Sequence, residues 1–279
     1  MNETGKFIQE LRIQAGLTQK TLADALHITD KAVSKWERGI CLPDVTLLPK
    51  LALLLDTDVE LLLSKSIGQK EWVGLIDIHG CDFSQRVYDK PLVYYLLSHY
   101  LLLEIRHIYV ITEEENVKYL KSPAFQTLGF DFSFSFPKDH PMMLLKHPWF
   151  LFGSNLTQLF QGAMLSEKSI KLVPQRQEPV FCFVQGTDID YQAMDQIYTT
   201  AQPKTIGRGM ICLDMRDNDK VLDVASFVRT YQQNTGLLIA SLEEIAYRKG
   251  YISKQQLIKL AKGTSYMIQL IDLCKPLVG

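Results

Sequence analysis

Three polar side chains near the N-terminus have a spacing that suits recognition of an anionic, hydrogen-bonding surface. Lys31, Ser34 and Lys35 lie three and four residues apart, so in a helix they share one face. A lysine ammonium can bind phosphate oxygens or the acceptor atoms of guanine, and a serine hydroxyl can donate or accept. Taken singly, such lysines more often simply solvate an exposed helix. The surrounding elements must decide between the two interpretations.

The chain has no comparable pattern for metal binding or nucleophilic catalysis. Its five cysteines are odd in number, far apart and without a Cys-x-x-Cys pair, which argues against a zinc site and a disulfide framework. The six histidines have no metal-ligand or triad spacing. We therefore expect no metal, no cofactor and a reducing, cytoplasmic environment.

Length and composition favour a folded chain of two domains. A length of 279 residues exceeds one small core, and 47% hydrophobic with 22% charged residues is typical of globular proteins. The net charge of -1 means that any contact with nucleic acid must come from a local basic face. The N-terminus lacks a signal-peptide pattern. The apolar run Pro91–Ile111 contains His99, Glu104, Arg106 and His107, so we expect no membrane span.

The elements that position the basic face are short helices. From Gly5 to Leu63 the apolar spacing is helical and predicts about five helices. Thr18 is a good N-cap for residues 19–26, and Thr29 for residues 30–37, with a tight turn between them. This arrangement is a helix-turn-helix. Its expected core is formed by Leu22, Ala23, Ile28, Val33 and Trp36.

The segment "GLTQKTLADALHITDKAVSKWERGICLPD" resembles the Cro/cI-type helix-turn-helix family of DNA-binding regulators. In that family the second helix enters the major groove and the first meets the phosphate backbone. The resemblance implies that double-stranded DNA is the partner. Four residues are expected to face bases: Asp30, Lys31, Ser34 and Lys35. Three are expected near phosphates: Gln19, Lys20 and Arg38. Thr29, at the start of the second helix, completes the expected contacts.

A second domain follows a short polar stretch, Ser64–Lys70, so we expect domains at 1–66 and 71–279. Beyond it, strands and helices alternate, which predicts an α/β domain with a mostly parallel sheet covered on both faces. Strands are expected at 72–78, 107–112, 131–136, 148–152, 170–173, 180–184 and 205–213. Helices are expected at 91–104, 113–121, 156–165, 191–199 and 219–233, and then at 242–249, 253–262 and 265–274. Ser241 and Glu244 predict a capping box at the first of these C-terminal helices.

Two passages of this region, Tyr88–Thr112 ("YDKPLVYYLLSHYLLLEIRHIYVIT") and Gly207–Ser253 (beginning "GRGMICLDMRD"), resemble glucose-1-phosphate thymidylyltransferase and related sugar nucleotidyltransferases. A weaker match is "FLFGSNL" at 150–156. The resemblance implies a nucleotidyltransferase-like fold. Those enzymes need a glycine-rich loop after the first strand and two carboxylates for magnesium. Here the loop keeps one glycine, Gly80, and Ser154 stands in place of one carboxylate, whereas Asp214 matches the other. We therefore expect no transferase activity.

A secondary nucleotide site of that family is the better candidate for a ligand. Its Gly-Arg-Gly and Glu-Glu-Ile-Ala-x-Arg motifs stand here at 207–209 and 243–248. Arg208 and Arg248 would hold phosphate oxygens. The full candidate set is Gly207, Arg208, Asp214, Glu244, Ile245 and Arg248. The alternative is that Glu244 and Arg248 form a salt bridge and the C-terminal helices only pack a dimer interface.

Three functions remain open from the sequence. The first is a transcriptional regulator whose second domain binds a nucleotide or nucleotide-sugar, and the second is the same regulator with that domain serving oligomerisation alone. The third is an active nucleotidyltransferase with an autoregulatory DNA-binding head. A helix-turn-helix head commonly reads one of two half-sites, so we expect a homodimer formed through the C-terminal domain.

Overall fold

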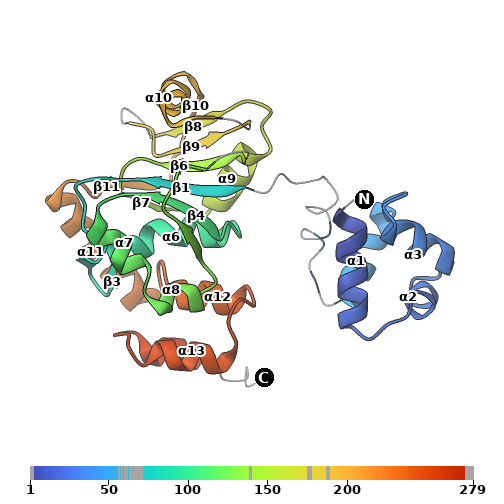
Figure 1. Ribbon diagram of the computed structural model, residues 1–279. Coiled ribbons are helices and arrows are strands. Elements are labelled where there is room, and N and C mark those ends of the chain that lie inside the picture. Colours follow the sequence, from blue (N-terminus) through green and yellow to red (C-terminus); the bar gives the residue numbers. More distant parts are fainter. Residues whose placement is uncertain are drawn as a thin grey trace. The chain divides into compact units, whose positions relative to one another are not determined.

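The chain forms two compact units, Met1–Glu71 and Trp72–Gly279. The computed structural model (Figure 1) describes residues 3–55, 57, 59, 62, 72–137, 140–174, 178–186 and 189–273. The polar stretch Ser64–Lys70 and the cysteine at 274 lie outside the described residues. Within them, no helix is both long and apolar enough to cross a membrane.

The first unit is helical. Its elements are α1 (Glu3–Gln14), α2 (Gln19–Leu26), α3 (Asp30–Glu37), the 3₁₀ turn η1 (Val45–Leu47) and α4 (Leu48–Leu54). The predicted bounds of α2 and α3 are confirmed, and Trp36, at 5% exposure, belongs to the core. That core also contains Leu22, Ala23 and Val33, with Ile28 half-buried against it. The first unit, called the head below, therefore has a hydrophobic core of its own.

The second unit is an α/β domain. Its strands are β1 (Val73–Asp77), β2 (Arg86–Val87), β3 (Lys90–Pro91), β4 (His107–Ile111), β5 (Asp131–Ser133), β6 (Met142–Leu145), β7 (Trp149–Phe152), β8 (Ile170–Val173), β9 (Phe181–Val184), β10 (Gln202–Thr205) and β11 (Ile211–Asp214). Its helices are α6 (Leu92–Leu102), α7 (Glu114–Leu120), α8 (Pro123–Thr127), α9 (Leu156–Met164), α10 (Tyr191–Thr200), α11 (Asn218–Thr235), α12 (Leu242–Arg248), α13 (Lys254–Ala261) and α14 (Met267–Asp272).

Seven strands form one mixed sheet in the order β10-β8-β9-β6-β1-β4-β5. Strands β6, β1, β4 and β5 run parallel, as do β10 and β8, whereas β9 is antiparallel to both of its neighbours. The predicted mostly parallel α/β class is thus confirmed. After β1 the chain moves to β4 and β5 on one side, and then crosses to β6 on the other. In such sheets ligands bind at the carboxyl ends of the strands where the order reverses.

Several strand predictions differ from the structure. The short strands β2 and β3 were not predicted, and the strand expected at 131–136 ends at Ser133. The central strand β6 was not predicted, because its four residues, Met-Met-Leu-Leu, are apolar without alternation and poor in β-branched types. The strand expected at 205–213 is wrong: β10 ends at Thr205 and β11 begins at Ile211. Gly207 and Gly209 interrupt it. Strands β7 and β11 pair with each other, apart from the main sheet.

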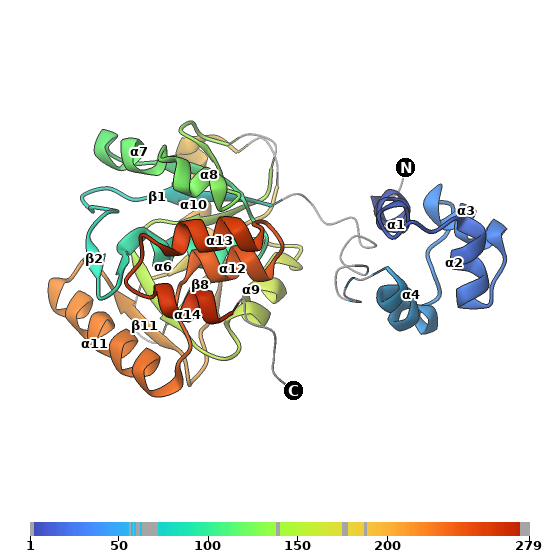
Figure 2. The same ribbon diagram turned by 90° about the horizontal axis from the view of Figure 1, so that it is seen from below.

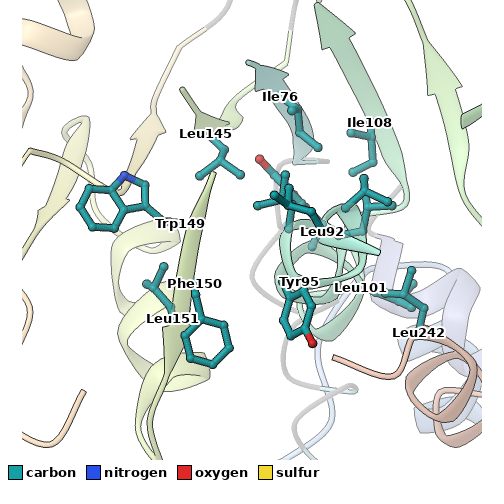
Figure 3. Close-up of a cluster of buried hydrophobic side chains, with 14 of the residues drawn as sticks. Ile76, Leu92, Tyr95, Leu101, Ile108, Leu145, Trp149, Phe150, Leu151 and Leu242 are labelled. Carbon is teal, nitrogen blue, oxygen red and sulfur yellow. The ribbon is translucent and has the colours of Figure 1, made fainter. Parts of the chain in front are cut away.

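Alternating side chains give the sheet two apolar faces. On one face Ile76, Ile108 and Leu145 point toward α6, which contributes Leu92 and Leu101 (Figure 3). On the other face, Leu75 and its neighbours pack with residues of α10. Both faces are therefore covered, as predicted.

The C-terminal helices pack on α6 through α12 (Figure 2). Ser241 caps α12 by accepting a hydrogen bond from the backbone N–H of Glu244, 3.3 Å away. The predicted return bond of a capping box is wrong, because the Glu244 carboxylate pairs with Arg248 instead. On the buried side of α12, Glu243 accepts hydrogen bonds from Tyr94 and Tyr266, at 3.0 Å each. These bonds fix the helical layer to the α/β core.

Candidate nucleic-acid interface and ligand residues

Local hydrogen bonds fix the geometry of α2 and α3. The Thr18 hydroxyl accepts from the backbone N–H of Thr21 at 3.0 Å, and the Thr29 hydroxyl accepts from that of Ala32 at 3.2 Å. These bonds satisfy N–H groups that have no partner within the helix. Between the helices His27 takes a left-handed conformation, with φ of 58°. The turn is consequently tight, and the entry of α3 is fixed.

The outward face of α3 is basic and exposed. Lys31 and Lys35 are exposed, Ser34 is half-buried, and the exposed Arg38 follows at the C-cap. The Asp30 carboxylate accepts the backbone N–H of Lys31 at 2.8 Å. A negative group at a helix N-terminus is stabilised there by the helix dipole. The structure thus places the sequence-predicted residues of α3 on one solvent-facing surface.

The hydrogen-bond network at Gln19 contains two residues that the sequence analysis did not predict, Arg12 of α1 and Glu37 of α3. Lys20 is exposed, whereas Gln19 is half-buried and donates from Nε2 to Glu37 Oε2 at 2.7 Å. Glu37 in turn pairs with the buried Arg12, at 2.6 Å between Nε and Oε1. This hydrogen bond raises the Arg12 pKa, against the lowering effect of burial. Arg12 and Glu37 are 25 residues apart, so no local spacing signals the pair.

In the second unit, the loop after β1 is tied down by the start of α7. The backbone N–H of Gly80 donates to Glu113 Oε1 at 2.8 Å. Asn116 accepts the N–H of Phe83 at 2.9 Å and donates to the carbonyl of Cys81 at 2.8 Å. The Gly80 bond lowers the pKa of Glu113. A carboxylate of the chain itself thus uses a backbone donor at the edge where parallel sheets bind phosphates.

The residues at Asp214 do not fit the magnesium ion that the nucleotidyltransferase resemblance implies. Arg216 donates from Nε to both Asp214 oxygens, at 3.0 and 2.9 Å, and pairs with Glu178 at 2.9 Å. Burial raises the Asp214 pKa, but the hydrogen bonds from Arg216 have the larger combined effect, so the pKa is lower than usual. Ser154 is exposed and supplies no carboxylate. Throughout the described segments, no cluster of three His, Cys, Asp or Glu side chains can hold a metal.

The other predicted ligand residues lie on two separate elements. Gly207 and Arg208 are exposed in the loop between β10 and β11, whereas Ile245 is half-buried on α12. On α12, Arg248 Nε donates to Glu244 Oε1 at 2.8 Å. The structure therefore forms the Glu244–Arg248 salt bridge of the alternative interpretation, and the ligand-binding role of these residues stays a prediction.

Comparison with known proteins agrees with a two-part chain. Residues 8–62 match the helix-turn-helix family, which suggests DNA binding by the first unit. Part of the remaining chain resembles glucose-1-phosphate thymidylyltransferases at low identity. The enzyme from Mycolicibacterium smegmatis is 37% identical over 75 residues, covering 25% of this chain and 26% of that protein. The enzyme from Neisseria gonorrhoeae is 25% identical over 249 residues, covering 63% of this chain and 85% of that protein.

The chain spans about a quarter of the length of the first curated relatives it matches, which include the Mycobacterium tuberculosis enzyme at 33% identity. A solved structure of a glucose-1-phosphate thymidylyltransferase from Bacillus anthracis, in complex with sucrose, is 9% identical with a TM-score of 0.40. It covers 57% of this chain and 95% of that chain.

Proposed function

We propose that this protein is a cytoplasmic, sequence-specific DNA-binding transcriptional regulator that acts as a homodimer. The observation that carries the proposal is the exposed basic face of α3, which presents Lys31 and Lys35 from a helix capped by Thr29 and set on a core of its own. A small head contacts one half-site, and two heads about one DNA turn apart, roughly 34 Å, read an operator. The C-terminal helices α12 to α14 are the proposed dimer interface.

The proposal further holds that the second unit does not transfer nucleotides. Two features support this part. Glu113 takes the Gly80 N–H that a phosphate would need, and Arg216 takes the Asp214 carboxylate that a metal would need. The Glu113 carboxylate thus lies where such an enzyme binds triphosphate, and the Arg216 guanidinium lies where it binds magnesium.

Binding to duplex DNA at several salt concentrations tests the regulator function. The wild-type chain should shift particular genomic fragments in a gel assay, with affinity that falls steeply as salt rises. Lys35→Ala should relax base preference, whereas Lys20→Ala, the matched control on α2, should weaken binding to all sequences alike. Lack of any preference over bulk DNA at every salt concentration would refute the regulator function.

A transferase assay tests the second part of the proposal. With common sugar phosphates, nucleoside triphosphates and magnesium, neither nucleotidyl transfer nor pyrophosphorolysis should occur. Turnover that Asp214→Ala abolishes would instead favour an active nucleotidyltransferase with an autoregulatory head.

The proposed effector of the second unit is a nucleotide or nucleotide-sugar, bound by Arg208, Arg248 and their neighbours. The bond to Glu244 uses the Nε–H of Arg248, and this arginine side chain is 63% exposed. Such an exposed ion pair is weak and presents a low barrier to a phosphate. Calorimetry with a panel of nucleotides and nucleotide-sugars should detect binding that Arg248→Ala removes. Absence of heat across the panel would leave the unit as a dimerisation scaffold. Light scattering that finds a monomeric chain would contradict the dimer.

A further inference from the structure

A buried ion pair holds the end of α3, the helix expected to enter the major groove. Arg12 of α1 is 8% exposed and Glu37, the last residue of α3, is 3% exposed. Arg12 donates twice to the Glu37 carboxylate, from Nε at 2.6 Å and from Nη2 at 3.1 Å. Its Nη1 also donates to the Leu17 carbonyl at 2.7 Å. A single guanidinium therefore connects α1, the approach to α2 and the end of α3.

The close approach of α1 to α3 depends on a glycine. A Cβ added at Gly5 would lie 2.3 Å from the Trp36 carbonyl oxygen and 2.7 Å from that of Glu37. No side chain fits in this position. The end of α3 is thus held by backbone contact as well as by charge, and Glu37 has little freedom to move.

The Glu37 carboxylate has a third donor, which lies at the surface expected to face DNA. Gln19 Nε2 donates to Glu37 Oε2 at 2.7 Å. One N–H of this amide is therefore used, and the second is left for another acceptor. Because Arg12 neutralises Glu37, the anchor adds no unpaired negative charge near a phosphate.

We propose that Glu37 is a positioning residue for DNA binding: it holds the Gln19 amide so that the free N–H is ready for a backbone phosphate. This inference rests on the proposed function. Fixing a glutamine side chain before binding removes an entropy cost that the complex otherwise carries. A merely structural Glu37 would stabilise the head and have no coupling with Gln19 in DNA affinity.

The test is a double-mutant cycle in the full chain. Arg12→Met together with Glu37→Met removes the pair without leaving a buried charge, a replacement that proteins often tolerate. Binding to a short mixed-sequence duplex at low salt should weaken about fivefold to tenfold, as expected for the loss of one hydrogen bond of ordinary strength. Gln19→Ala should weaken it as much, and should have no further effect in the Met/Met background.

Lys20→Ala is the matched control, because its phosphate contact does not depend on Glu37. It should weaken binding equally in the wild-type and Met/Met backgrounds. Unchanged affinity of the Met/Met variant, or an equal loss from Gln19→Ala in both backgrounds, would overturn the positioning role. Failure of the wild-type chain itself to bind duplex DNA would instead refute the proposed function.

Side-chain relaxation provides a second measurement if the Met/Met variant does not fold. In the DNA-free wild-type chain the Gln19 amide should be rigid on the nanosecond timescale, unlike that of the exposed Gln126 on α8. Equal mobility of the two amides would overturn the proposal.

Discussion

A buried histidine makes the stability of the α/β unit depend on pH. His99 of α6 is 5% exposed, and neither ring nitrogen has a hydrogen-bond partner among the described residues. Its ring packs edge-on against Phe160 and Phe181, with centroids 5.8 and 5.6 Å away. Burial lowers the His99 pKa from 6.5 to about 4.

The direction of the effect follows from proton linkage. The neutral imidazole is favoured in the native state, so the unfolded chain binds the proton first as pH falls. The free energy of unfolding is therefore highest above about pH 6.5 and declines as the pH falls toward 4. Each pH unit between the two pKa values corresponds to about 1.4 kcal/mol, so the loss amounts to about 3 kcal/mol.

Replacement by phenylalanine isolates this contribution. His99→Phe removes two unpaired nitrogens, each of which costs about 1–3 kcal/mol when buried, and adds a slightly larger ring to a packed site. The variant should be more stable than the wild type at neutral pH by about 1–2 kcal/mol, and should lose less stability between pH 7 and 5.

Urea unfolding of the full chain measures these free energies. In a Trp36→Phe background, the two remaining tryptophans, Trp72 and Trp149, both report on the α/β unit. His107→Gln, which removes a partly exposed imidazole from β4, is the matched control and should retain the pH dependence due to His99. Parallel curves for wild type and His99→Phe between pH 7 and 5 would refute the reasoning.

Three further substitutions test packing and charge. Gly5→Ala should speed amide hydrogen exchange in α1 and α3, because its methyl would lie 2.3 Å from the Trp36 carbonyl oxygen; native-like exchange would contradict this. Gly74→Ala should lower the urea midpoint of the α/β unit by overpacking against a methyl 2.6 Å away, a cost of about 1–3 kcal/mol. Arg216→Ala should raise the Asp214 pKa in a carboxyl NMR titration, since hydrogen bonds from Arg216 lower it; an unchanged pKa would show that the guanidinium does not hold this carboxylate.

The head could be predicted from sequence because its determinants are local. Thr18 and Thr29 lie directly before the helices that they cap, and the apolar spacing identifies Val33 and Trp36 as core. The anchor of the head was missed because Arg12 meets its partner across 25 residues. Long-range pairing leaves no periodic signal.

In the second unit, alternation predicted the fold class but not the details at the carboxyl edge of the sheet. Strand β6 has no β-branched residue and was overlooked, although it is central to the sheet. The role of Arg216 was also missed, because only the turn after β11 brings its guanidinium back onto Asp214, two residues earlier. The resemblance identified Asp214 but gave no information on what would pair with it.

The strand order also determines when each unit can fold during synthesis. The last residue of the head core is Leu62, whereas β9, which closes the gap between β6 and β8, ends at Val184. The ribosome must add 122 residues between them (184 − 62). At roughly 5–20 residues per second this takes on the order of 10 s. The head is thus complete on each nascent chain well before the central sheet can close.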